Sequence, residues 1–210
     1  MKKIIFDLDN TLIMFNEKYI ECYCQVLHEF GYDDSLLDAY KLYYSIGRYE
    51  ALQQKYDKEA LIAFVNNDIH TNYTLKFFDK LLDAIGTYWI QSISNEIKDT
   101  LNYLSEKYEL YVLTNWFTNC QKKRLKKTYL LNYFKEVIGS DIVGPKPTKE
   151  VFDYLVKNKK DYIMIGDNID IDYYGAINYG IDAILFDHQN QYSHLNIKKI
   201  NKFHELKEVL

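Results

Sequence analysis

The sequence predicts an α/β protein, with a doubly wound, Rossmann-like parallel sheet as its core and a small all-helical cap domain. Three observations support this fold class. Short apolar runs alternate with helical periods through the second half of the chain, polar residues follow four of the runs, and a long helical stretch separates the first run from the second. Alternating strands and helices are typical of a parallel sheet covered by helices on both faces. A chain of 210 residues has room for one such core and a modest insertion.

Five apolar runs have the length and composition of buried parallel strands. The first covers residues 4–6, and the others cover residues 110–113, 136–138, 162–165 and 183–186. Between the later runs, apolar residues recur at intervals of three and four, as on one face of a helix. We therefore expect five parallel strands joined by helical connections.

Residues 16–86 interrupt this alternation, because their pattern is helical throughout. We expect them to form the cap, placed over the carboxyl edge of a core made of residues 1–15 and 87–210. Asn16 is a candidate N-cap for a first cap helix over residues 17–30.

Glycines and periodicity divide the rest of the cap. Gly31 is a typical stop signal for the first helix. Gly47 separates two later helical periods, which predicts an inter-helix loop. The further helical periods cover residues 35–44, 49–56, 58–65 and 75–85.

Composition and charge exclude several function classes. Apolar residues make up 48% of the chain, and 26 basic against 30 acidic residues give a formal net charge of −4. Such a chain has no general positive field for nucleic acid or anionic lipid, and no window approaches the roughly 20 apolar residues of a membrane span. The short apolar start is unlike a signal peptide, and the odd set of three cysteines favours reduced thiols. We expect a cytoplasmic monomer or homodimer that binds neither nucleic acid nor membranes.

Polar residues follow four of the predicted strands, at the edge where open α/β sheets bind ligands. Alone, each cluster also has a structural explanation, such as a turn, a helix cap or a solvated loop. Four clusters in this order favour a site that combines acids for a divalent cation with a lysine and a hydroxyl for phosphate oxygens. The residues are Asp7 and Asp9, then Thr114 and Asn115, then Lys146 between Pro145 and Pro147, and finally Asp167 with Asn168, Asp170 and Asp172.

These clusters resemble the four motifs of the haloacid dehalogenase superfamily of phosphatases. The similar segments are FDLDNTL at residues 6–12, LTN at 113–115, GPKP at 144–147 and IGDN at 165–168 with Asp172. Their spacing and order match over nearly the whole chain, and the helical segment resembles the cap that this family inserts after its first motif. The resemblance implies a phosphatase of small phosphorylated metabolites, of the nucleotide or sugar phosphate class.

The resemblance also implies roles for the acids. Asp7 would be the nucleophile that forms an aspartyl phosphate, and Asp9 would protonate the leaving oxygen and later accept a proton from water. Mg²⁺ would be held by the Asp7 carboxylate, the Asp9 backbone carbonyl and Asp167. Asp172 and Asn168 would position these groups without binding the ion themselves. Asp172 would do so by orienting Lys146 or a metal-bound water.

Other residues would bind the substrate. Thr114 and Lys146 would neutralise the phosphoryl oxygens, and Asn115 would shape the same pocket. Trp116 stands where relatives often have glycine, which makes it a candidate aromatic wall, together with Tyr43 and Tyr44. Arg48 is a second substrate-binding candidate, because related caps place a loop near the phosphate site and arginine is a planar bidentate donor. The alternative for Arg48 is a surface pair with Glu50 or another nearby acid.

Two other functions remain open on these residues. A phosphomutase acting on a sugar phosphate would retain both acids, and a non-catalytic protein could bind a phosphorylated metabolite on the same fold. The histidines lack the spacing of zinc ligands, and no Gly-x-Ser-x-Gly elbow is found, which disfavours a zinc or serine hydrolase. The basic run over residues 122–127 is interpreted as a solvated surface, because its side chains spread around several helix faces.

Overall fold

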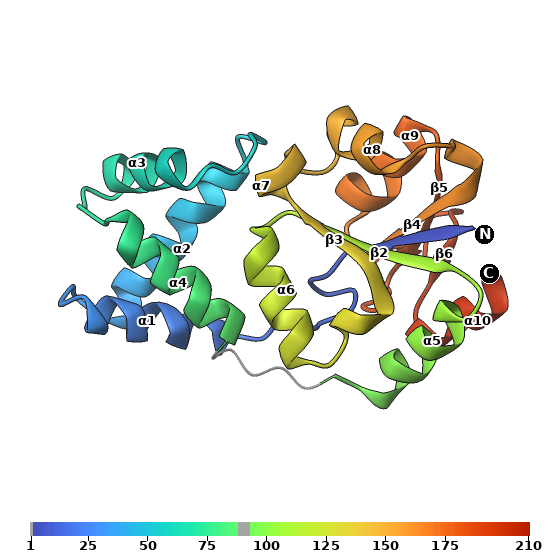
Figure 1. Cartoon of the computed structure of the whole chain (residues 1–210), viewed down its shortest axis with the longest axis horizontal. Helices are drawn as coiled ribbons and strands as arrows, with labels where there is room; N and C mark the ends of the chain where they lie inside the picture. The colour runs from blue at the N-terminus through green and yellow to red at the C-terminus, as the bar shows by residue number, and fades with distance from the viewer. Residues whose placement is uncertain (1, 88–92) are drawn as a thin grey trace.

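The computed structural model describes residues 2–87 and 93–210 and contains one six-stranded parallel sheet (Figure 1). The strand order is β3-β2-β1-β4-β5-β6, so β1 lies inside the sheet between β2 and β4. The order reverses at β1, as in a doubly wound fold. The strands are β1 (Lys3–Phe6), β2 (Glu109–Thr114), β3 (Phe134–Gly139), β4 (Tyr162–Gly166), β5 (Asp182–Phe186) and β6 (Lys199–Ile200).

Helices cover both faces of this sheet, and successive residues of β1 show how the two apolar layers form. Ile4 and Phe6 pack into one layer and Ile5 into the other, because neighbouring strand residues point to opposite faces. The first layer includes α5 (Asn95–Ser105), part of α6 (Thr118–Lys127) and α10 (Leu206–Val209). The second includes α8 (Lys149–Leu155) and α9 (Gly175–Tyr179). A one-turn helix, α7 (Ser140–Val143), follows β3.

Within the described residues between β1 and α5, four helices form the predicted helical cap, to one side of the sheet (Figure 1). They are α1 (Tyr19–Glu29), α2 (Leu36–Glu50), α3 (Lys58–Asp68) and α4 (Leu75–Thr87). The cap has its own apolar cluster, which extends to Phe117 and Cys120 of the core. Helix α6 therefore packs on α4 and joins the cap to the sheet.

The fold class is confirmed, and two expectations about the cap are wrong. Helix α2 runs without interruption through Gly47 to Glu50, and where a helix over residues 49–56 was expected, residues 51–53 form a turn and residues 54–57 have no regular secondary structure. The reason is packing: Leu42, Ile46 and Tyr49 lie on one buried face of α2. Burial of that face outweighs the roughly 1 kcal/mol that glycine costs inside a helix.

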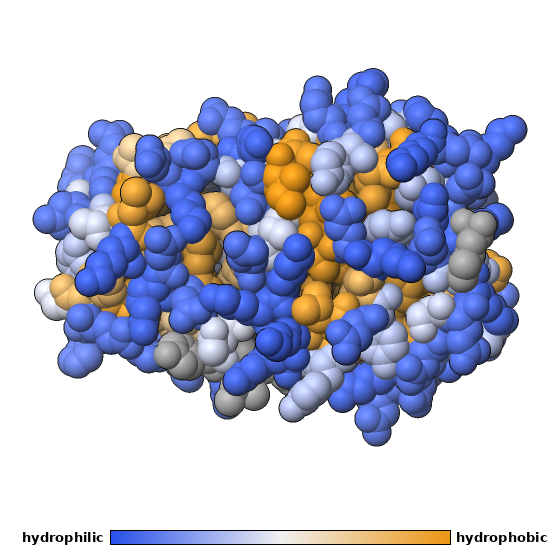
Figure 2. Space-filling view, in the orientation of Figure 1, coloured by the Kyte–Doolittle hydropathy of each residue, from blue (hydrophilic) through white to orange (hydrophobic). Residues whose placement is uncertain are grey.

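Two further elements were not predicted. Strand β6 has only two residues, too few for a periodic signal. Residues Ile169–Tyr174 form a π-helix rather than the first turns of an ordinary helix. Figure 2 shows hydrophilic residues over most of the face seen in Figure 1, with hydrophobic patches between them. Within the described residues, none of the helices combines the length and the apolar character needed to cross a membrane.

Candidate active site

The carboxyl ends of β1, β2 and β4 bring three of the four polar clusters together. Phe6 at the end of β1 is aligned with Val112 of β2 and Ile165 of β4, and the Asp7 backbone N–H donates to the Ile165 carbonyl. Asp7 therefore lies at the centre of the carboxyl edge. The loop after α7 supplies Lys146, which completes the set.

Lys146 is the central cation of the site. Its Nζ donates to Asp7 Oδ1 at 2.6 Å and to Asp172 Oδ1 at 2.7 Å, and the residue is only 2% exposed. Burial alone lowers the pKa of Lys146, but Asp172 and Asp7 together raise it above its ordinary value. Lys146 is therefore held as a buried cation that links the nucleophile candidate to the fourth motif.

Asn115 holds the backbone of the Lys146 loop. Its side-chain Nδ2 donates to the Lys146 carbonyl at 3.0 Å, and its Oδ1 accepts from the Lys146 N–H at 2.7 Å. Pro147 in the same loop packs against Gly175, where a Cβ would lie only 2.5 Å from the proline Cβ. The amide of Asn115 is thus occupied by the loop, although the residue also lines the cavity described below.

Gly166 and Asn168 position Asp172. A Cβ at Gly166 would lie 2.2 Å from Asp172 Oδ2, so only glycine allows the carboxylate to approach the end of β4. The Asn168 N–H donates to the same oxygen at 3.2 Å. The Asn168 side chain accepts from the N–H groups of Asp170 and Ile171, which caps the π-helix that carries Asp172.

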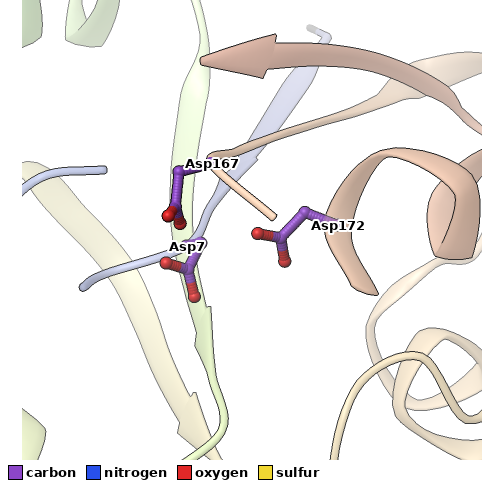
Figure 3. Close-up of side chains that lie close together, drawn as sticks. All are labelled: Asp7, Asp167 and Asp172. Carbon is purple, nitrogen blue, oxygen red and sulfur yellow. The ribbon is translucent and has the colours of Figure 1, made fainter. Parts of the chain in front are cut away.

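Three carboxylates form a candidate metal site. Oxygens of Asp7, Asp167 and Asp172 all lie within 4.8 Å of one another, and Figure 3 shows Asp7 and Asp167 beside the strands and Asp172 on the neighbouring helical segment. Burial, followed by the charge of Asp172, raises the pKa of Asp167 to about 6. Burial also raises the pKa of Asp7, although Lys146 opposes this. Crowded carboxylates of this kind fit a hard divalent cation such as Mg²⁺, which takes oxygen ligands.

The side chain of Asp9, expected to face the leaving oxygen of a substrate, pairs with Arg124 in this structure. Arg124 Nη2 donates to Asp9 Oδ1 at 2.6 Å and Arg124 Nη1 to Asp9 Oδ2 at 2.9 Å, a bidentate pair. Gln121 Nε2 donates to Asp9 Oδ2 at 3.2 Å and to the Thr114 hydroxyl at 2.9 Å, and Gln121 Oε1 accepts from Arg124. Asp9 and Thr114 are therefore joined through helix α6.

The interpretation of residues 122–127 as a solvated surface is wrong for Arg124. The four lysines of this run are exposed, but Arg124 is 4% exposed and faces the site. A signal was present in the sequence, because this arginine is one of two in a lysine-rich chain and lies one helical turn after Gln121.

A cavity of about 260 Å³ opens above these groups, between core and cap. Its core side is formed by Asp7, Asp9, Thr114, Asn115, Trp116 and Arg124. The cap side is mostly aromatic and aliphatic, with one carboxyl group, that of Glu50. The remaining lining residues are Phe15, Tyr19, Tyr23, Tyr43, Ile46, Gly47 and Ile85.

Arg48 and Tyr44 are not among the residues that line the cavity. Because α2 continues through Gly47, Arg48 lies on the helix instead of in a loop, and its Nε donates to Asp68 Oδ2 at 3.0 Å. The Ser45 hydroxyl donates to the same oxygen at 2.6 Å. Tyr44 is 58% exposed, whereas Tyr43 and Trp116 do line the cavity as expected.

A doubly wound parallel sheet with acids, a lysine and a helical cap at its carboxyl edge defines a capped α/β protein with a ligand site at the switch point of its sheet. The sequence profile of the haloacid dehalogenase-like hydrolases matches residues 4–186, and the chain belongs to that family. All four polar clusters fall within the matched segment.

Individual relatives agree with this assignment. The chain is 26% identical over 224 residues to pyrimidine 5'-nucleotidase PynA of Streptococcus pneumoniae, covering 100% of this chain and 93% of that protein. It is 28% identical over 210 residues to ribulose-1,5-bisphosphate 5-phosphatase of Halopiger xanaduensis, covering 88% of this chain and 84% of that protein. The crystal structure of the HAD-hydrolase YfnB of Bacillus subtilis, bound to magnesium, superposes with a TM-score of 0.75 at 20% identity, covering 100% and 98% of the two chains.

Proposed function

We propose that the chain is a Mg²⁺-dependent phosphatase that hydrolyses the phosphate monoester of a small metabolite through an aspartyl phosphate on Asp7. The observation that carries this proposal is the position of Asp7. It lies at the core side of the cavity, bonded to Lys146 and within a cluster of carboxylates suited to a divalent cation. The names of two relatives, a pyrimidine 5'-nucleotidase and a ribulose-1,5-bisphosphate 5-phosphatase, support the same reaction class.

In the first step, an Asp7 carboxylate oxygen attacks phosphorus in line with the leaving oxygen. The bond from phosphorus to Asp7 forms as the ester bond breaks, and Asp9 gives its proton to the leaving oxygen. In the second step, Asp9 takes a proton from water as that water attacks the aspartyl phosphate. Inorganic phosphate leaves and Asp7 is restored as a carboxylate.

The surrounding groups neutralise charge during both steps. Lys146 and the Thr114 hydroxyl would face the phosphoryl oxygens, and Asp172 keeps Lys146 in place. Asp7 and Asp167 would hold the Mg²⁺, with Asp172 next to them, and the Asp9 backbone carbonyl would be a further ligand, as the resemblance to the family motif implies. When bound, the ion supplies positive charge for the phosphoryl oxygens.

Asp9 must change partners during this cycle. Both of its oxygens accept hydrogen bonds from Arg124 here, so the oxygen that carries the transferred proton has to leave the guanidinium. The cavity supplies the alternative partner, because the leaving oxygen of a bound ester would lie beside Asp9.

The test is phosphate release from p-nitrophenyl phosphate and from a panel of nucleotides, sugar phosphates and glycolytic acids. We expect turnover with Mg²⁺, little turnover after chelation, and loss of at least a thousandfold in Asp7→Asn, because an amide cannot form the phosphoenzyme. Circular dichroism should show that Asp7→Asn is folded. Near-normal turnover by this variant would contradict the mechanism, and isomerisation of a sugar phosphate without phosphate release would identify a mutase.

A further inference from the structure

The cap side of the cavity differs chemically from the core side. The core side carries the acids, the Thr114 hydroxyl and the Arg124 guanidinium. The cap side offers the rings of Tyr19, Tyr23 and Tyr43 and the apolar Ile46 and Ile85. Among the described residues, Glu50 is the one charged side chain that the cap contributes to the cavity, and no cap lysine or arginine lines it.

Glu50 is positioned by helix α2, which precedes it in the chain, and by Tyr56, which follows it. It is the last residue of α2, one turn after Ile46. The Tyr56 hydroxyl lies close enough to the Glu50 carboxyl group to lower its pKa. Tyr56 is itself fixed to the core, because its backbone N–H donates to the Ser140 carbonyl at 3.1 Å and its ring packs against Trp116 and Phe117. The position of Glu50 over the cavity is therefore set by both domains.

The carboxyl group of Glu50 is short of partners. Among the described residues the carboxyl group forms no ion pair, and Tyr56 is the one side-chain donor that acts on it, although a carboxylate can accept about four hydrogen bonds. Burial raises the pKa of Glu50 to about 7, with the Asp9 charge acting in the same direction and Tyr56 opposing it. A half-buried acceptor with spare capacity at the edge of a cavity is stabilised when a ligand supplies a donor.

We propose that Glu50 is a specificity-determining residue that accepts a hydrogen bond from an O–H or N–H group of the leaving alcohol. The inference rests on the proposed phosphatase function and names its substrate class. The substrate is the monophosphate of an uncharged alcohol that has a planar or cyclic body and a hydrogen-bond donor beyond it. Nucleoside monophosphates belong to this class, since their bases stack on aromatic rings and carry N–H groups.

The same carboxylate disfavours a second phosphate. With the scissile phosphoryl group at Asp7, a second one on the leaving alcohol would approach the cap side of the cavity. Above about pH 7, where Glu50 is ionised, it would meet the like charge of Glu50 there, with no cap cation among the described residues to neutralise it. Bisphosphates should therefore be poor substrates, in contrast to what the name of the Halopiger relative indicates for that protein.

The experiment compares kcat/KM for four substrates in wild type, Glu50→Gln, Glu50→Leu and the control Glu59→Gln, which changes an exposed cap glutamate on α3. The substrates are uridine monophosphate, ribose 5-phosphate, ribulose 1,5-bisphosphate and p-nitrophenyl phosphate. The last has a planar ring and no donor, which matches it to the nucleotide. Mg²⁺ is present throughout.

We expect Glu50→Leu to lower kcat/KM for uridine monophosphate by about 10- to 100-fold, the loss of one hydrogen bond to a charged group. The same variant should change turnover of p-nitrophenyl phosphate by less than about threefold and raise that of the bisphosphate relative to the monophosphates. Glu50→Gln keeps the shape and one acceptor oxygen, so it should fall between wild type and Glu50→Leu. Glu59→Gln should match wild type on every substrate.

Equal losses on all four substrates in Glu50→Gln, with unchanged thermal stability, would overturn the proposal, as would unchanged selectivity in both Glu50 variants. A wild-type preference for p-nitrophenyl phosphate or for the bisphosphate over uridine monophosphate would also overturn it. Failure of the wild-type enzyme on every substrate would instead contradict the phosphatase function itself.

Discussion

At the scale of single residues, the two arginines show how far sequence patterns reach. Arginine in a lysine-rich chain indicates a need for a planar bidentate donor, and that reasoning selected Arg48. In the structure both arginines pair with a carboxylate, but Arg48 Nε and Nη2 share one oxygen of Asp68 on the cap surface, whereas the two terminal nitrogens of Arg124 bind separate oxygens of Asp9 in the site. The residue type was informative, whereas the partner depended on which face of α6 turns toward the sheet.

Arg124 should act on turnover through Asp9. Arg124→Lys keeps the charge but loses the bidentate geometry, so we expect kcat/KM for an alkyl phosphate to fall by about tenfold or more. In an Asp9→Asn background the same change should cost less than about threefold, because residues that act together have non-additive effects. The measurement is a double-mutant cycle on kcat/KM. Losses that multiply independently in the double variant would mean that Arg124 does not work through Asp9.

At the scale of elements, the strands were predictable and the cap boundaries were not. Buried parallel strands are continuous apolar runs, which the sequence displays directly. The sequence pattern predicts a break at Gly47, whereas helix α2 continues through it. A glycine inside a helix and a glycine between two helices look alike in a single sequence. What separates them is the burial of Ile46 and Tyr49 on either side, which depends on the other cap helices.

Gly47 and Gly31 form a matched pair for testing this description. A Cβ at either position would meet no atom within 4 Å, but Gly31 has φ +70 and Gly47 is helical. Gly47→Ala should therefore raise the free energy of unfolding by about 0.5–1 kcal/mol, and Gly31→Ala should lower it by roughly 1 kcal/mol or more. Urea unfolding followed by circular dichroism measures both. Destabilisation by Gly47→Ala would mean that α2 does not continue through this residue.

At the scale of the whole molecule, the site could be predicted as a set of residues but not as a network. Asp7, Lys146 and Asp167 follow strands, and parallel strands bring their carboxyl ends to one edge. The bond between Asp9 and Arg124 depends on the rotation of α6, and the position of Glu50 depends on how the cap sits on the core. Neither the Asp9–Arg124 pair nor the position of Glu50 can be predicted from the spacing of residues along the sequence.

Mg²⁺ binding should stabilise the folded chain in a pH-dependent way. An ion that binds only the folded state, at about a hundred times its Kd, adds about 2.7 kcal/mol, or roughly 5–10 °C in Tm. Asp167 has a raised pKa of about 6, so at pH 5 the ion has to displace a proton from it and at pH 7.5 it does not. We expect a larger rise in Tm at pH 7.5 than at pH 5, measured by thermal unfolding with Mg²⁺ and with chelator.

The raised pKa of Asp167 also determines how the stability of the metal-free chain changes with pH. Between about pH 4 and pH 6 the folded chain binds more protons at Asp167 than the unfolded chain does, so stability without metal should decrease as pH rises through that range. Asp167→Asn should remove most of the Mg²⁺ effect. An equal rise in Tm at both pH values, or a full rise in this variant, would contradict the assignment of the metal site.

The place of β1 in the sheet also determines how the chain can fold during synthesis. β1 is synthesised before both of its neighbours in the sheet, β2 and β4. Ile4 can therefore pair with Leu110, and then with Ile163, only after those residues have been synthesised. At roughly 5–20 residues per second, the second partner follows about 10–30 s later. The cap helices contact one another locally and can form in that interval. β1 therefore remains without its sheet partners during this interval, whereas the cap helices can already pack on one another.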